Sequence, residues 1–320
     1  MIRVRRGASP PRAACTPAGR LGSSSAKAAS AAARSPARAA RAMTLDALDK
    51  RLSYPFFLIE LGALEIPLSP IFTWFGAPLP AMGFMPHLIA LASPGGAGRA
   101  AWAATAVALG AAVAAHWARC VRAGDLHAFY TTRPVLPLLV ATCALARLTD
   151  RAAAVSFYLV HFFVAESLVL LVKARAGRVR PGVCAALGPR LARARRRLPQ
   201  ITFVGMSGPT CIESFPSGDA AGAAVFAYAL RAFGGWSRAA AALVAAGAAF
   251  GRLYLFAHHL GDVAAGAAIA LATGVALDAW AAPLGLAHVA FGVPAFAAAY
   301  ALATRLRRPL PPEFREKQEG

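Results

Sequence analysis

The sequence predicts an all-α fold, a polytopic bundle of transmembrane helices. Of its 320 residues, 58% are hydrophobic and 15% are charged, whereas a soluble domain is usually about 45–50% apolar and about 25% charged. The apolar residues are gathered in blocks of about 20, the length that crosses a hydrocarbon core as a helix. Because no alternating strand pattern accompanies these blocks, a membrane β-barrel is not expected.

Residues 1–45 form a basic segment rich in alanine, serine and proline, which we expect to be disordered. The first acidic residue of the chain is Asp46. An Arg- and Ser-rich segment without acids is typical of an organellar transit peptide. A disordered basic tail, or a true start at Met43, would explain the composition equally well.

Residues 46–98 contain two apolar segments, 54–75 and 77–93, that are interrupted by prolines. They also carry Glu60 and Glu65. Because proline breaks helices and carboxylates are costly in hydrocarbon, we expect tilted, re-entrant or interfacial pieces in this region.

Continuous apolar blocks follow in the rest of the chain. The expected membrane helices are 99–118, a shorter 133–147, 152–172, 217–233, 238–257, 261–281 and 285–304. Very short connections join the last four, which favours antiparallel neighbours. The predicted organisation is therefore a main transmembrane domain at 99–281, an additional apolar helix at 282–304 and a polar tail at 305–320.

The net charge of +20 comes from 34 basic and 14 acidic residues, and the surplus lies at the N-terminus and in the polar loop 174–214. Such a surplus suits nucleic acid, anionic lipid or an anionic substrate. Because these are two segments of a membrane protein and not a soluble domain, nucleic acid is not expected as a partner. Membrane lipids and a phosphorylated lipid remain as the expected partners.

Five cysteines show no metal-ligand spacing, and neither a metal nor another cofactor is expected. Cys184 and Cys211 bracket one polar loop, an arrangement that would allow a disulfide in an oxidising lumen. Two free thiols are the favoured interpretation. Nothing in the sequence indicates an oligomeric state.

Polar residues cluster at the ends of four of the predicted helices. The first cluster contains Lys173 and Arg180, where a strong hydrophobic helix ends, and the second contains Ser217, Gly218 and Asp219, just before an apolar run. Cations can neutralise a phosphate dianion. A helix start with Ser217 and Gly218 offers backbone N–H groups and a positive dipole end, which together suit a phosphate.

The third cluster contains Arg252, His258 and Asp262, between the end of one helix and the start of the next. Arg252 is a third cation for the phosphate. His258 is a candidate nucleophile or base, and Asp262, one helical turn later, could fix its tautomer and stabilise its cation. The helix pairs 152–173 with 217–233 and 238–257 with 261–281 bring the clusters to one face. The sequence thus predicts a phosphate site.

These three clusters resemble the signature of the type 2 phosphatidic acid phosphatase (lipid phosphate phosphatase) and haloperoxidase superfamily. That signature is Lys-x6-Arg-Pro, then Pro-Ser-Gly-His, then Ser-Arg-x5-His-x3-Asp. Lys173 to Pro181 matches the first part, Pro216 to Gly218 the second part up to its last residue, and Arg252 to Asp262 the third. The resemblance covers roughly residues 99–281.

The resemblance implies a six-helix phosphatase core, with extra apolar segments around it, and a phosphomonoesterase mechanism without a metal. His258 would attack phosphorus to give a phosphohistidine, and Asp262 would orient it. Lys173, Arg180 and Arg252 would hold the phosphoryl oxygens together with Ser217 and Gly218. The substrate would be a lipid phosphate such as phosphatidate.

One departure from the family concerns catalysis. The family's second motif ends in a histidine that protonates the leaving oxygen, and here the residue is Asp219. Asp219 could act as the acid, His259 could replace the missing histidine, or the protein could bind phosphorylated lipid with little or no turnover. Two further departures are Gly251, in place of the family's serine, and Phe256, where glycine is common.

Three functions therefore stay open: a lipid phosphate phosphatase, which is favoured, a weak or inactive phospholipid-binding protein, and a lipid phosphotransferase using the same His–Asp pair. The expected location is an integral, multi-pass position in an organellar membrane (plastid or mitochondrial) or in the endoplasmic reticulum. Two ionisable residues inside a predicted span, His161 and Glu166, are expected to serve helix packing or polar pairing.

Overall fold

The computed structural model describes residues 44–57, 59, 61, 64–94, 97–123, 129, 135–181, 213–280 and 284–307. Within them, regular structure is helical except for one isolated β-bridge, between Val179 and Glu213. The predicted all-α fold is thereby confirmed. The basic N-terminal segment up to residue 43, Glu60, and the loop with Cys184 and Cys211 lie outside the described residues.

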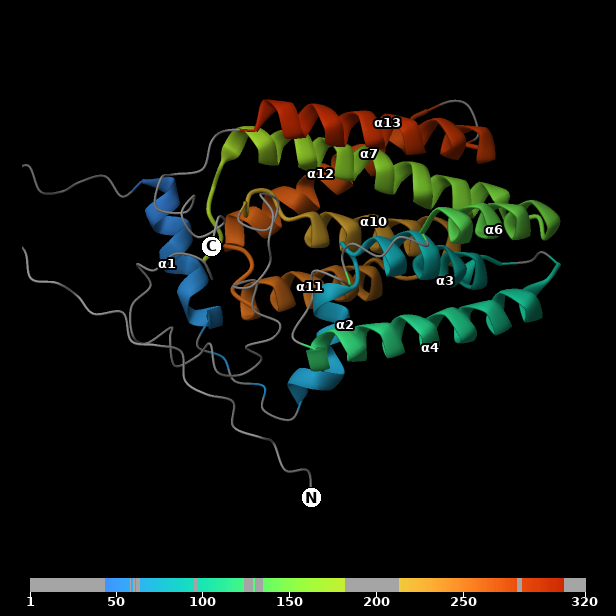
Figure 1. Cartoon of the computed structure of the whole chain (residues 1–320), viewed down its shortest axis with the longest axis horizontal. Coiled ribbons are helices and arrows are strands. Elements are labelled where there is room, and N and C mark those ends of the chain that lie inside the picture. The colour runs from blue at the N-terminus through green and yellow to red at the C-terminus, as the bar shows by residue number, and fades with distance from the viewer. Residues whose placement is uncertain are drawn as a thin grey trace, which may run out of the picture. The chain divides into compact units, whose positions relative to one another are not determined.

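The larger helices form a bundle in which they run alongside one another (Figure 1). They are α4 (Arg99–Ala123), α6 (Val135–Leu148), α7 (Ala152–Ala176), α10 (Gly218–Gly234), α11 (Arg238–Tyr254), α12 (Leu260–Asp278) and α13 (Leu286–Leu306). Helix α7 packs against α13, α10 and α12, while α10 also packs against α11 and α12. Buried aromatic and small residues of α7 and α10, such as Phe162 and Ala224, form the core between them.

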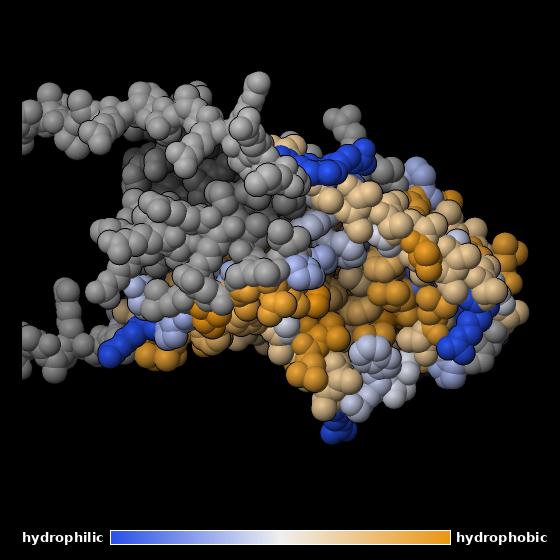
Figure 2. Space-filling view, turned by 90° about the horizontal axis from the view of Figure 1, so that it is seen from below, coloured by the Kyte–Doolittle hydropathy of each residue, from blue (hydrophilic) through white to orange (hydrophobic). Residues whose placement is uncertain are grey.

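Four of these helices, α4, α7, α12 and α13, are long and apolar enough to cross a membrane. The chain is thus a multi-pass membrane protein. Figure 2 shows one face of the molecule, where apolar side chains cover most of the described surface and strongly hydrophilic residues are few. Such a surface suits contact with lipid hydrocarbon.

Helix α11 is shorter than the span predicted at 238–257, whereas α10 has the length predicted at 217–233. Each has 17 residues, and α11 ends at Tyr254 although its apolar run continues to residue 257. The physical reason is a turn in which Phe256 has a φ of 56°, a left-handed conformation that a helix cannot contain. Packing of the Phe256 ring on Phe57, with centroids 5.1 Å apart, accompanies this conformation. A positive φ also explains why glycine suits this position in the family.

The Pro-broken region before residue 99 forms short elements, as the interrupted pattern indicates. They are α1 (Leu45–Phe57), α2 (Glu65–Thr73), the π-helical turn η3 (Leu79–Phe84) and α3 (Met85–Ala92). Helix α2 packs against α11, and α3 packs against α10, α4 and α7. Helix α1 lies across one end of the bundle, at a steep angle to the long helices (Figure 1), and contacts α11 and α12 there.

Gly251 is explained by the packing of α2 on α11. A Cβ at this position would lie 2.2 Å from a ring carbon of Phe72, so the family's serine does not fit here.

We expect Gly251→Ser to destabilise the protein by about 1–3 kcal/mol, the usual result of overpacking a core. Thermal unfolding in detergent measures this loss. Gly247→Ser, one turn earlier on α11, is the control, since its nearest neighbour is a methyl group of Ile71 at 3.4 Å; equal losses in the two variants would contradict the explanation.

Candidate functional site

The predicted site residues come together at one end of the bundle, where α7 ends, α10 begins, α11 ends and α12 begins (Figure 1). All of the charged and hydroxyl-bearing ones are buried in this structure. They are Lys173, Arg180, Ser217, Asp219, Arg252, His258 and Asp262. Burying so many ionisable groups is costly unless they are paired, so their contacts define what the site can do.

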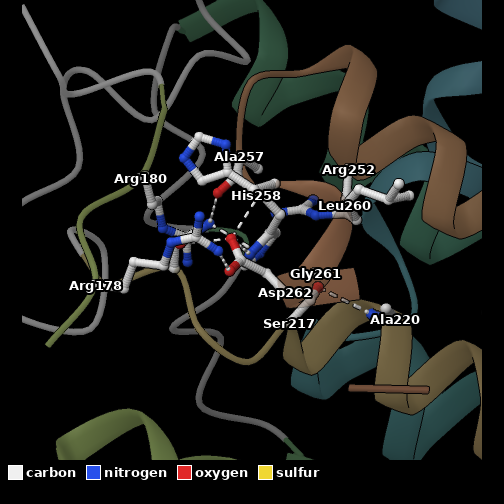
Figure 3. A network of polar contacts seen from close by, with 12 residues as sticks. Arg178, Arg180, Ser217, Ala220, Arg252, Ala257, His258, Leu260, Gly261 and Asp262 are labelled. Carbon is white, nitrogen blue, oxygen red and sulfur yellow. Dashed lines mark hydrogen bonds and ion pairs between the residues drawn. The ribbon is translucent and has the colours of Figure 1, made fainter. Parts of the chain in front are cut away.

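The candidate nucleophile His258 lies between Arg180 and Asp262 (Figure 3). Its Nε2 is 3.2 Å from Nη1 of Arg180, and its Nδ1 is 3.8 Å from Oδ2 of Asp262. Because a guanidinium can only donate, Nε2 is the accepting nitrogen and the ring proton belongs on Nδ1, facing Asp262. Burial lowers the pKa of His258 well below its usual value, and Arg180 adds to this effect. The neutral ring therefore presents a lone pair on Nε2.

Asp262 is held by more groups than the sequence indicated. Its carboxylate accepts hydrogen bonds from Ser214 Oγ at 2.6 Å, from the backbone N–H of His259 at 2.8 Å and from Nη1 of Arg178 at 2.6 Å. The side chain is fully buried. These contacts fix the orientation of the carboxylate that faces His258. Ser214 and Arg178 are site residues that sequence reasoning missed.

A short pairing between two segments of chain positions Arg180. Helix α7 ends at Ala176, and its C-cap Gly177, with a φ of 61°, turns the chain. Val179 then forms a β-bridge with Glu213, and Ser214 N–H donates to the carbonyl of Arg178 at 2.6 Å. The six residues between Lys173 and Arg180 thus form the end of the helix, the turn and the β-bridge. This spacing brings the lysine at the helix end and the arginine that follows the bridge to the same site.

Ser217 is the N-cap of α10, and its Oγ accepts from the backbone N–H of Ala220 at 3.3 Å. Its own N–H donates to the carbonyl of Asp262 at 2.9 Å. Close approach of α12 is possible because Gly266 faces it: a Cβ there would lie 2.2 Å from the carbonyl oxygen of Ser217. The positive end of α10 is thus fixed beside the start of α12, next to the candidate nucleophile.

Asp219 pairs with Arg252, one of the three cations. Oδ2 of Asp219 lies 3.0 Å from Nη2 of Arg252, and Oδ1 accepts from the backbone N–H of Gly76 at 3.1 Å. Arg252 also donates to the carbonyl of Phe72 at 3.1 Å. Asp219 thus forms an ion pair with Arg252 and accepts a hydrogen bond from Gly76, and both partners are groups that can only donate. The residue at the family's histidine position therefore offsets a cation of the phosphate site.

Other polar residues near the site have different surroundings. His161 Nε2 is 2.7 Å from the carbonyl of Ala270 on α12, so its predicted role in polar pairing between helices is confirmed. Oε1 of Glu166 is buried and has no hydrogen-bond partner among the described residues, so pairing does not account for that atom. His259 is buried, and its ring lies against Phe57, with centroids 6.2 Å apart.

Helix α1 is attached to the site through Arg178. This arginine contacts Asp49 at 2.6 Å and Asp46 at 2.8 Å, in addition to Asp262. Burial opposes ionisation, but the carboxylates of Asp262 and Asp49 prevail and raise the pKa of Arg178. Asp49 also accepts from the N–H of Gly261 at 2.7 Å. An element far from the signature motifs thus takes part in the site.

The comparison with known families gives one match, and its range contains all three clusters. A model of the PAP2 superfamily matches residues 154–284. The resemblance to that superfamily, predicted from the three motifs, is confirmed over these residues. The superfamily consists of phosphatases and related phosphotransferases, so its general chemistry is phosphoryl transfer. No curated protein and no solved structure matches the chain.

Proposed function

We propose that this PAP2-superfamily protein is an integral membrane phosphatase that hydrolyses a lipid phosphate monoester such as phosphatidate. The observation that carries the proposal is the setting of His258. Its Nε2 faces a guanidinium 3.2 Å away, in a buried cluster with Lys173 and Arg252. A neutral imidazole whose Nε2 lone pair faces a guanidinium that a phosphate can bind in its place suits attack on that phosphate.

In the proposed reaction, Nε2 of His258 attacks phosphorus while the lipid alcohol leaves, giving a phosphohistidine. Lys173 and Arg180 hold the phosphoryl oxygens, with the N–H groups at the start of α10. Asp262 faces the Nδ1–H group, which keeps its proton, and stabilises the positive charge that the imidazole ring gains. Water then attacks phosphorus, which releases inorganic phosphate and restores the neutral ring.

Asp219 and an incoming phosphate compete for Arg252. Its ion pair with Asp219 is one that an incoming phosphate can rearrange, because a dianion is a stronger partner than one carboxylate. The same pair supports the second candidate function, a protein that binds phosphorylated lipid with little turnover.

An assay of phosphate release, with product analysis in the presence of diacylglycerol as an acceptor, separates hydrolysis, phosphotransfer and binding alone. No release and no transfer with phosphatidate or prenyl pyrophosphates at pH 5 to 8 would contradict the proposed enzyme.

An apolar groove beside the site supports the proposal that the substrate carries a lipid chain. The groove has a volume of about 550 Å³ and lies between α1 and α12, with Leu48, Leu52 and Ala264 in its wall. Leu48 and Leu52 are 36% and 50% exposed. The charged residues of the lining, Arg178 with Asp46 and Asp49, are paired with one another. A groove with a mainly apolar wall suits the hydrocarbon chain of a phospholipid.

We expect Leu48→Gln to raise KM for long-chain phosphatidate about tenfold, because a buried leucine contact contributes about 1.5 kcal/mol or more. KM for a soluble short-chain phosphatidate should change little. Steady-state assays in mixed micelles measure both values. The control is Arg51→Gln, an exposed residue of α1 outside the groove wall. An equal change for both chain lengths would contradict a chain-binding groove.

The proposed location is an organellar membrane. The support is the basic, acid-free composition of residues 1–45, which is typical of a transit peptide. A fusion of these residues to a fluorescent reporter tests this directly, and a reporter that stays in the cytosol would contradict it.

A further inference from the structure

We propose that Glu166 is the proton donor to the leaving oxygen, in the part that the second-motif histidine plays in the family. The inference rests on the proposed phosphatase function. It assigns a catalytic role to a residue outside the three signature motifs.

The first reason is where the carboxyl group of Glu166 lies. A Cβ added to Gly218 would be 2.9 Å from Oε2 of Glu166 and 3.5 Å from its Oε1. Gly218 is the first residue of α10, at the helix start that we expect to receive the phosphate. The carboxyl group on α7 therefore touches the phosphate cradle, and glycine is the residue that leaves room for it.

The second reason is that this carboxyl group is buried without full hydrogen bonding. Oε1 of Glu166 is enclosed and has no hydrogen-bond partner among the described residues. An unsatisfied buried oxygen costs about 1–3 kcal/mol, and ionisable residues inside membrane helices are usually functional. Helix packing alone would be served better by an apolar side chain at this position. A substrate atom that shares a proton with the carboxyl group would satisfy it.

The third reason is that Asp219 is engaged elsewhere. Its two oxygens contact Arg252 and the N–H of Gly76, and both partners are donors. Neither a guanidinium nor an amide N–H group can accept a proton, so a carboxyl group that faces both is not placed to act as an acid. Glu166 is not so occupied, which leaves it as the acid at the cradle.

The fourth reason is the arrangement of the two helices that flank the cradle. Ser217 contacts α12 at Gly266, and Gly218 contacts α7 at Glu166. His258 lies just before α12, so the candidate nucleophile and Glu166 are supplied by the helices on either side of the cradle. In-line displacement needs attack and departure on opposite sides of phosphorus.

Depth in the membrane supports the same assignment. Glu166 precedes Lys173 by two helical turns, about 10 Å along α7, and α7 is a membrane-spanning helix. Lys173 lies in the last turn, at the polar end. In a lipid phosphate the alcohol oxygen lies between the phosphate and the chains. A donor on the inner side of the cradle therefore faces the oxygen that leaves.

The proposed step is balanced. As the bond from His258 Nε2 to phosphorus forms, the bond from phosphorus to the lipid oxygen breaks, and the carboxyl proton of Glu166 moves to that oxygen. In the second half, the water oxygen bonds to phosphorus and its protons leave with inorganic phosphate, while the Glu166 carboxylate takes a proton from solvent. The bond to His258 breaks, inorganic phosphate leaves, and the carboxyl group is protonated again.

The test compares substrates whose leaving groups differ in their need for a proton. With Glu166→Gln we expect kcat for phosphatidate, which releases an alkoxide, to fall about 10²–10⁴-fold, the usual contribution of a general acid. Turnover of 4-nitrophenyl phosphate, whose leaving phenolate is stable without a proton, should change little. The control is His161→Gln, at a buried polar residue of the same helix, which we expect to affect both substrates to the same degree.

Each result decides the inference. A Glu166→Gln protein that loses both activities equally while its thermal unfolding is unchanged, or that loses neither, overturns the assignment of Glu166. A wild-type protein that releases phosphate from neither substrate overturns the proposed function itself, and the role of Glu166 with it. If Glu166→Gln does not fold, Glu166→Asp retains the carboxyl group on a shorter side chain. We expect it to reduce phosphatidate turnover more than turnover of the phenyl ester, and an equal reduction overturns the inference.

Discussion

Replacing His258 by alanine is expected to abolish phosphate release from phosphatidate, with a loss of about 10⁴-fold or more, because removal of a nucleophile leaves only the contribution of binding groups. The expectation depends on the neutral ring whose Nε2 faces Arg180 at 3.2 Å. Alanine removes the attacking atom and leaves the cations in place. Phosphate release from detergent-purified protein measures the loss, and phosphatidate binding should persist.

Trapping the phosphohistidine intermediate shows whether His258 is the nucleophile. With ³²P-labelled phosphatidate and rapid acid-free quenching, the wild-type protein should carry label on His258, and His258→Ala should carry none. His288→Ala is the control, because His288 lies in the first turn of α13 and outside the site. Activity of His258→Ala equal to that of wild type would contradict the mechanism.

The sequence predicts the position of the site because its residues occur at helix ends. Lys173, Ser217 and Asp262 each lie within a turn of a boundary between an apolar run and a polar connection. Helices of similar length joined by short links must bring alternate ends to the same side. The structure does bring these residues to one end of the bundle.

The contacts around Asp262 could not be predicted in the same way. Arg178 joins Asp262 to Asp46 and Asp49, which lie 132 and 129 residues away from it in the sequence. Such pairing depends on how α1 lies across the bundle, and helical periodicity carries no information on that placement. The sequence offers two signals: Arg178 is a basic residue within the first motif, and Asp46 and Asp49 lie on one face of a short amphipathic helix. Neither signal identifies the partner of these residues.

Helix ends show the same limit. The apolar run 238–257 predicts a continuous helix, but the chain leaves the helix after Tyr254. Phe256 takes a left-handed conformation, in which its ring packs on Phe57. Burial of the ring against a distant residue outweighs the local preference of a non-glycine residue for negative φ. His258 follows this turn, so the break in the helix is also what places the candidate nucleophile.

Replacing Asp219 by asparagine is expected to strengthen binding of inorganic phosphate about tenfold or more. Asp219 competes with phosphate for Arg252, 3.0 Å away, and opposite charges about 4 Å apart interact by about 4 kcal/mol at an effective dielectric constant of 20. Asparagine retains the shape and an oxygen for the N–H of Gly76 without the charge. Isothermal titration of phosphate into the purified protein measures the change. Asp150→Asn, in the turn before α7, is the isosteric control away from the site.

Stability and turnover of Asp219→Asn then distinguish the roles still open for this residue. Arg252 is fully buried, and breaking a buried ion pair typically costs about 3–5 kcal/mol. We therefore expect a lower Tm without phosphate and a larger rise of Tm on adding phosphate than in wild type. If Asp219 only offsets the charge of Arg252, turnover of phosphatidate should persist while product phosphate inhibits more strongly. If Asp219 is itself the acid, turnover should fall about 10²–10⁴-fold, and the assignment of that step to Glu166 would be wrong.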